Sequence, residues 1–238
     1  MQDLRVNKER LWDSLMEIAQ FGATEKGGCN RLAGTDLDKQ ARDLFVSWCK
    51  TAGCEITIDK IGNIFARRPG KNNDLPAVGT GSHLDTQPTG GKFDGVFGVL
   101  AGVEVLRTLH ENKIETPTAM EFSVWTNEEG SRFQPAMQGS GVYAGRFDLE
   151  TELNKTDVDG IRLGDELKRI GYLGDAEPGS RNVGAFFETH IEQGPILEDA
   201  DKAIGIVRLG QGIRWYNIEI IGQESHSGTT PMYLRKDA

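Results

Sequence analysis

The stretch GSHLDTQPTGGKFDG, residues 81–95, lies between a run of small and β-branched residues and an apolar segment of helical length. The preceding AVGTGS, residues 77–82, predicts a buried strand, and residues 95–112 predict a helix. The stretch itself is too rich in glycine for a helix and too polar for a core. It therefore predicts the strand, loop and helix of an α/β fold, with polar residues at the carboxyl end of the strand.

The rest of the chain repeats this alternation of helical and extended segments. Apolar residues at helical spacing predict amphipathic helices at 7–20 and 36–52, the second with Asp36 as its N-cap and Gly53 as its stop. Short β-branched runs predict further strands, at 55–59, 63–68, 119–125, 184–190 and 203–209. We predict an α/β fold with a mixed central sheet flanked by helices.

Two segments differ from this pattern. Residues 148–182 are the most polar part of the chain and are expected to form an exposed helical excursion. Residues 213–223, IRWYNIEIIGQ, alternate as a half-exposed antiparallel strand does, which indicates the start of a separate unit. We expect one domain over residues 1–211 and the beginning of a second over residues 212–238.

The composition favours a protein that acts on small molecules. The chain has 238 residues and a net charge of −9, and its longest basic run is Arg67-Arg68, so nucleic acid or an anionic membrane has little to bind. The three cysteines form no C-x-x-C pair, and no segment has the roughly 20 apolar residues of a membrane span. We expect a cytoplasmic protein without nucleic-acid or membrane partners.

One histidine and two carboxylates stand out in residues 81–95. Asp85 lies two residues after His83, where a carboxylate can accept the second N–H of the imidazole and fix its tautomer. Asp94 precedes Gly95, so its backbone is free to aim a carboxylate into a cleft. The alternative is a turn with a solvated aspartate and a histidine at the edge of the core.

Two other strand ends carry similar groups. Glu128 and Glu129 follow the strand at 119–125. They could form an acidic turn, or, beside a divalent cation, supply one metal ligand and one general base. His190 ends the strand at 184–190. Open α/β sheets build sites at the carboxyl ends of neighbouring strands, so we expect these groups to converge. Imidazole and carboxylate without thiolate suit Zn²⁺, Mn²⁺ or Co²⁺, and Asp94 is the natural bridge between two ions.

Four motifs, GSHLDTQPTGGKFDG, WTNEEGSRFQPAMQGSGVYAG, ETHIEQGPILE and GQESHSGTTPM, resemble in this order the metal-dependent amidohydrolases of the M20 peptidase group. Within the group, residues 31–238 are most similar to the branch of N-carbamoyl-L-amino-acid hydrolases, β-ureidopropionases and allantoate amidohydrolases. The resemblance implies a zinc-exopeptidase-like catalytic domain and the start of a small α+β dimerisation domain. It also implies two divalent ions per full-length subunit, Zn²⁺ or Mn²⁺, Co²⁺ or Ni²⁺.

The resemblance further implies roles for the residues that match its motifs. The implied metal ligands, which all offer imidazole or carboxylate groups, are His83, Asp94, His190 and Glu129, with Asp94 as the bridge. Glu128 is implied as the general base, and Asp85 as the residue that orients His83. The peptide bond between Asp94 and Gly95 is a candidate for the cis form.

On the substrate side, the resemblance implies that Gln193 binds the ureido or carboxylate part of the substrate. It also implies that His226 polarises the scissile carbonyl, reaching in from the partner subunit of a homodimer. Gln193 and the segment SHSGTTPM favour a small ureido substrate over a peptide.

The function implied by the resemblance is hydrolysis of the carbamoyl C–N bond of N-carbamoyl-L-amino acids or 3-ureidopropionate, giving an amino acid, carbon dioxide and ammonia. Members of the branch continue past the position of Ala238 to another histidine that completes the second metal site, so we expect a truncated chain with little or no activity. The alternatives are an allantoate amidohydrolase, an aminoacylase or dipeptidase of the wider group, and a non-catalytic metal-binding remnant.

Overall fold

The computed structural model describes residues 4–214, 216 and 218–238. Contacts divide the chain into two compact units, residues 1–191 and residues 192–238. The first unit contains the sheet and most of the helices, and the described residues of the second form one short α-helix and one 3-10 helix. None of the helices in the described ranges has the length and apolar character needed to cross a bilayer.

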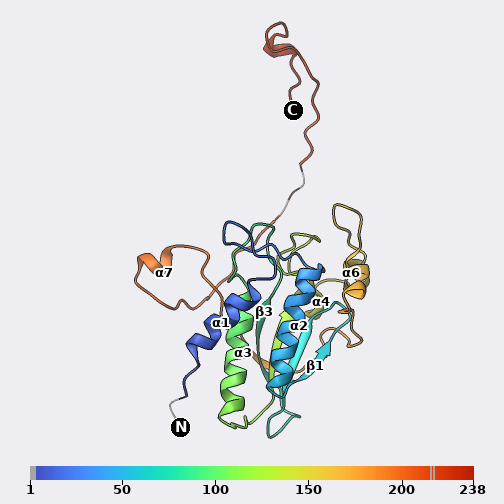
Figure 1. The fold of residues 1–238 in the computed structure, drawn as a ribbon. Helices are drawn as coiled ribbons and strands as arrows, with labels where there is room; N and C mark the ends of the chain where they lie inside the picture. The colour runs from blue at the N-terminus through green and yellow to red at the C-terminus, as the bar shows by residue number, and fades with distance from the viewer. Residues whose placement is uncertain (1–3, 215, 217) are drawn as a thin grey trace. The chain divides into compact units, whose positions relative to one another are not determined.

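A five-stranded mixed sheet forms the centre of the first unit (Figure 1), which confirms the predicted fold class. The strands lie in the order β1 (Glu55–Ile58), β2 (Ile64–Arg68), β4 (Met120–Trp125), β3 (Ala77–His83) and β5 (Val183–Phe187). The pairs β1–β2 and β2–β4 are antiparallel, whereas β3 runs parallel to both β4 and β5. The carboxyl ends of β3, β4 and β5 therefore lie at the same edge of the sheet.

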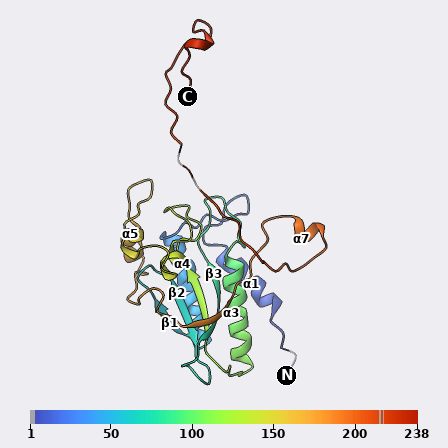
Figure 2. The same ribbon diagram turned by 180° about the vertical axis from the view of Figure 1, so that it is seen from behind.

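Three helices cover one face of this sheet, as Figures 1 and 2 show from opposite sides. They are α1 (Lys8–Ile18), α2 (Asp36–Thr51) and α3 (Val96–Glu111), and each confirms a helix predicted from the sequence. The predicted N-cap of α2 is wrong. The hydroxyl of Thr35 accepts the backbone N–H of Asp38 at 3.2 Å, because Asp36 is already the first helical residue.

The two faces of the sheet carry different side chains. On the face that the helices cover, Phe122 and Val124 of β4 are fully buried. They belong to the same hydrophobic core as Leu100 and Val103 of α3. On the other face, Phe65, Trp125 and Tyr143 pack with ring centroids 5.2–5.9 Å apart, and Tyr143 belongs to α4 (Gln138–Tyr143). The central strands β2 and β4 are thus held from both sides, which fixes the position of the residues that follow β4.

The polar segment 148–182 is less exposed than its composition predicts. It contains α5 (Leu149–Leu153) and α6 (Leu163–Arg169), as expected for a helical excursion. However, Leu163, Leu167 and Ile170 are buried in the main core. The expectation of full exposure is wrong because a few apolar residues at helical spacing suffice to bury one side of a helix in an otherwise polar segment.

The second unit contains α7 (Ile196–Asp199) and the 3-10 helix η1 (Met232–Leu234). The strand predicted at 203–209 is wrong, because these residues form no strand. The described residues of 213–223 also form no strand; Gln223 alone makes an isolated bridge, to Lys236, and Trp215 and Asn217 lie outside the described residues. A strand needs a neighbour for its backbone hydrogen bonds, and alternation in the sequence does not supply one.

Candidate metal centre

Three parallel strands deliver the predicted site residues to one edge of the sheet. His83 is the last residue of β3 and pairs in register with Trp125, the last residue of β4. Glu128 follows β4 by three residues, and His190 follows β5 by three residues. The burial of β3 and β4 in the core holds these ends in place, which explains why side chains far apart in the sequence meet here.

Asp94 reaches the same edge from the loop between β3 and α3. Gly95 caps α3 with a φ of +64°, and a Cβ added to it would lie 2.2 Å from Nε2 of His83. Only glycine fits there without displacing the imidazole. The predicted cis bond between Asp94 and Gly95 is wrong: among the described residues the cis peptide is Gln134–Pro135, and the positive φ of Gly95 turns the chain instead.

Three potential ligands meet in the His83–Asp94–His190 cluster. One ligand atom from each of these residues lies within 4.8 Å of the others. Nε2 of His190 is 3.2 Å from Oδ1 of Asp94, and the two imidazole rings are 6.4 Å apart. Nε2 of His83 also lies 3.3 Å from Oε2 of Glu128. Two imidazoles and a carboxylate at this spacing are a donor set that suits Zn²⁺, Mn²⁺ or Co²⁺.

Hydrogen bonds fix the tautomer of both histidines. Nδ1 of His83 lies 2.8 Å from the carbonyl of Asp85, and Nδ1 of His190 lies 2.8 Å from the carbonyl of Ile191. A carbonyl can only accept, so each Nδ1 carries the proton and donates it. In the neutral ring, each Nε2 then presents a lone pair to a carboxylate oxygen of Asp94 or Glu128. A cation between these atoms would relieve that repulsion, so the residues fit a metal.

Asp85 acts on the glutamates as well as on His83. Its carboxylate is fully buried and accepts the backbone N–H groups of Glu128 at 3.2 Å and Glu129 at 3.1 Å. Oδ1 of Asp85 is 3.8 Å from Nδ1 of His83, which is too far for the hydrogen bond that the sequence predicts. The backbone carbonyl of Asp85 accepts the hydrogen bond from Nδ1 instead. A single residue therefore connects the end of β3 to both glutamates that follow β4.

The charges of the site favour the binding of a cation. Burial raises the pKa of Glu128, the nearby His83 lowers it, and the neighbouring carboxylates of Asp85 and Glu129 raise it further. Burial also raises the pKa of Glu129, against a hydrogen bond from Gln87. For His83, burial opposes the charged form, but Asp85 and Glu128 outweigh it and raise its pKa. An excess of carboxylates that are buried or partly buried is the electrostatic condition that a divalent ion neutralises.

Glu129 does not belong to the three-residue cluster. Its Oε2 accepts a hydrogen bond from the amide of Gln87 at 2.6 Å. Its pKa responds to the charges of His83, Asp94 and Asp85, so its carboxylate faces the same group of side chains. Glu129 therefore lies beside the cluster, where a second ligand site was predicted.

Buried residues that no sequence pattern singled out hold these loops. Arg31 is fully buried, and its Nε donates to the carbonyl of Leu84, between His83 and Asp85, at 2.8 Å. Asn127 has a left-handed backbone, φ +48°, and its side chain donates to the carbonyl of Phe133 at 2.7 Å. The available signal in the sequence was an asparagine directly after a predicted strand, because asparagine tolerates the left-handed conformation.

Two predicted substrate residues, Gln193 and His226, belong to the second unit. Gln193 is exposed and has a φ of +59°. Nδ1 of His226 accepts the backbone N–H groups of Gly228 at 3.1 Å and Thr229 at 3.3 Å. These contacts are local, and the roles of both residues stay predictions.

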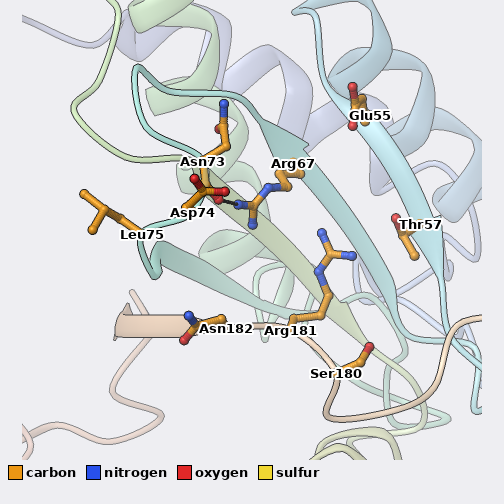
Figure 3. Close-up of a pocket in the computed structure, with 9 residues that line it drawn as sticks. All are labelled: Glu55, Thr57, Arg67, Asn73, Asp74, Leu75, Ser180, Arg181 and Asn182. Atoms are coloured by element: carbon orange, nitrogen blue, oxygen red, sulfur yellow. Dashed lines mark hydrogen bonds between the residues drawn. The ribbon is translucent and has the colours of Figure 1, made fainter.

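A separate hollow lies at the amino end of β3, away from the cluster (Figure 3). The guanidinium groups of Arg67 and Arg181 point into it, and both contact the buried carboxylate of Glu121. Glu55 and Asp74 also line the hollow. Two cations against three carboxylates leave no excess positive charge for an anion, so the hollow offers no comparable chemistry.

Comparison with known proteins identifies the family. Residues 79–235 match the model of peptidase family M20/M25/M40. The chain belongs to this family. The match includes all three residues of the His83–Asp94–His190 cluster and the ends of the three strands that carry or precede them.

Relatives of this M20 protein lie in the predicted branch. The N-carbamoyl-L-amino-acid amidohydrolase of Rhizobium meliloti is 52% identical over 237 residues, which are 100% of this chain and 57% of that protein. The allantoate amidohydrolase of Bacillus subtilis is 35% identical, with 97% of this chain and 56% of that protein aligned. A hydantoinase/carbamoylase family amidase of Burkholderia ambifaria superposes with a TM-score of 0.87 at 51% identity, covering 98% of this chain and 57% of that one. The chain thus spans somewhat more than half the length of these relatives.

Proposed function

We propose that the protein is a metal-dependent amidohydrolase that cleaves the carbamoyl C–N bond of N-carbamoyl-L-amino acids or 3-ureidopropionate. The observation that carries the proposal is the convergence of His83, Asp94 and His190 within 4.8 Å, with Glu128 beside them. The similarity to carbamoyl amidohydrolases at 52% identity supports the substrate class. A bound divalent cation would supply Lewis acidity and make water a stronger acid.

The chain's own residues divide the remaining work. His83, Asp94 and His190 would hold one cation, and Asp94 and Glu129 a second. Glu128 would take a proton from the attacking water and deliver it to the leaving nitrogen as the C–N bond breaks. The water oxygen joins the carbamoyl carbon, and the carbamate so formed breaks down to carbon dioxide and ammonia. Asp85 would hold Glu128 and His83 in fixed positions relative to each other, because it accepts a hydrogen bond from each of them.

Glu128→Gln and Glu129→Gln test this division of roles. We expect Glu128→Gln to bind cobalt(II) as the original protein does and to lose ammonia release from an N-carbamoyl-L-amino acid. Glu129→Gln should weaken cobalt binding. Glu115→Gln, an exposed acid in the loop before β4, serves as the matched control and should change neither property. Equal loss of metal in both active-site variants would contradict the assignment.

A substrate panel distinguishes the alternatives. Release of ammonia from N-carbamoyl-L-amino acids or 3-ureidopropionate, but not from allantoate, supports the proposal. Preferential cleavage of allantoate or of a dipeptide would favour another M20 activity. Metal binding without hydrolysis of any of these compounds would favour a non-catalytic metal-binding protein.

We also propose a homodimer in which His226 of one subunit contacts the substrate held by its partner. The support is the match of the SHSGTTPM segment to the family motif, within the region 79–235. Sedimentation equilibrium tests the oligomeric state. Mixing His226→Ala with Glu128→Gln tests the shared site, because mixed dimers should recover activity that neither variant has alone.

A further inference from the structure

Gln87 links the loop after β3 to the acidic loop after β4. Its Nε2 lies 2.6 Å from Oε2 of Glu129, and its Oε1 accepts the hydroxyl of Ser131 at 2.7 Å. A carboxylate can only accept, so the NH₂ end of the amide must face Glu129. The amide oxygen of Gln87 then faces Ser131, whose hydroxyl donates a hydrogen bond to it. The two partners together specify a single orientation of the Gln87 amide.

The backbone beneath Gln87 is fixed as well. Its carbonyl accepts the hydroxyl of Thr86 at 2.9 Å and the backbone N–H of Gly90 at 3.2 Å. Thr86 is buried, and its N–H and hydroxyl are both bonded to the backbone of Arg31. The Gln87 side chain therefore starts from an anchored position, although it is itself exposed.

Glu129 needs such an anchor. Its backbone N–H is held by Asp85, and burial is the main cause that raises the pKa of its side chain; the Gln87 hydrogen bond and His83 lower that pKa, whereas the charges of Asp94 and Asp85 raise it and repel the ionised form. Repulsion would turn a free carboxylate out toward solvent. The hydrogen bond from Gln87 restrains one carboxylate oxygen and opposes this movement.

We propose that Gln87, supported by Ser131, is a positioning residue that holds the Glu129 carboxylate ready for a divalent cation. The inference rests on the proposed function, because it takes Glu129 as a metal ligand. Among the described residues, the hydrogen bonds of the Gln87 side chain go to Glu129 and Ser131 and not to His83 or His190. Gln87 therefore acts through Glu129. Outer hydrogen-bond partners of metal ligands change metal affinity by about 10- to 100-fold when they are removed.

Calorimetric titration of the 238-residue chain with cobalt(II) chloride tests the proposal without an activity assay. Glu129→Ala first identifies the binding step that depends on Glu129. Gln87→Ala should weaken that same step by about tenfold or more and leave the other cobalt affinity unchanged. Gln87→Glu should weaken it further, since a second carboxylate would face Glu129. Ser131→Ala should have a smaller effect in the same direction.

Gln20→Ala is the matched control, because Gln20 is an exposed glutamine whose amide makes one hydrogen bond, to the carbonyl of Met16. It should leave every cobalt affinity unchanged. If Glu129→Ala weakens a step and Gln87→Ala does not, the role of Gln87 is refuted while the metal site stands. If Gln87→Ala weakens all steps equally, its effect is general and the proposal is also refuted. If Glu129→Ala changes no step, the ligand role of Glu129 fails, and the inference fails with it.

Discussion

Replacing Gly95 by alanine is expected to weaken metal binding as well as destabilise the fold. Gly95 combines two constraints, a φ of +64° and contact with the imidazole of His83. An alanine Cβ would lie 2.2 Å from Nε2 and 2.3 Å from Cδ2 of that ring. Non-bonded carbon atoms prefer separations of about 3.5–4.0 Å, so the ring must move by roughly an ångström or more. That movement displaces the ligand atom of His83 from the cluster.

The two constraints contribute separately to the free energy of unfolding. A backbone with φ +64° and ψ −46° costs alanine about 1–3 kcal/mol, of which about 0.4–1 kcal/mol is offset by the smaller entropy of the unfolded chain. Forcing an extra methyl group into a packed site costs about 1–3 kcal/mol more. We therefore expect Gly95→Ala to lose about 2–4 kcal/mol of stability. Cobalt affinity should fall by at least about 100-fold, since a ligand itself is displaced.

Two other glycines separate these contributions. Gly160 has a φ of +79° and no neighbour within 4 Å of an added Cβ, so Gly160→Ala measures the backbone cost alone. Gly91 lies in the same loop as Gly95, without a positive φ and without such a neighbour, so Gly91→Ala should cost nothing. Urea unfolding gives the stability of each variant, and calorimetric titration gives its cobalt affinity. The reasoning is refuted if Gly95→Ala binds cobalt as tightly as Gly91→Ala does.

Three further predictions concern buried polar residues. Asn127→Ala should lower the free energy of unfolding, measured with urea, by about 2–4 kcal/mol, because the buried carbonyl of Phe133 loses its donor and alanine must adopt a positive φ. Asn127→Gly should recover the part of this loss that comes from the positive φ. Burial raises the pKa of Asp59 to about 6, with hydrogen bonds from Asn63 opposing. The native state therefore holds this proton more tightly than the unfolded state, whose pKa is about 3.9, and the contribution of Asp59 to stability falls as pH rises from about 4 to 6. The difference in unfolding free energy between Asp59→Asn and the original protein should change by up to about 3 kcal/mol across this window, and a constant difference would contradict it. Arg31→Met should lower cobalt affinity as well as stability, because the carbonyl of Leu84 loses its buried donor beside His83; a stability loss with unchanged affinity would show that Arg31 does not position the ligand.

Local patterns in the sequence predicted most of the first unit. The helices at 7–20, 36–52 and 95–112 and the strands that carry His83 and precede Glu128 follow from one rule, the local pattern of apolar and β-branched residues, which acts within a few residues of chain. The same rule failed for residues 203–209 and for the exposure of residues 148–182. In both cases the outcome depends on a partner, a neighbouring strand or a core, that lies elsewhere in the chain.

The sequence by itself determined which residue types stand at the ends of the strands, since imidazoles and carboxylates follow predicted strands at fixed spacing. The tertiary structure decided how they meet. The parallel pairing of β3 with β4 and β5 brings three distant strand ends to one edge, and backbone carbonyls rather than carboxylates set the tautomers of His83 and His190. Gly95, Asp85 and Gln87 acquire their roles only there, because a close approach or a hydrogen bond between distant loops is a property of the folded chain.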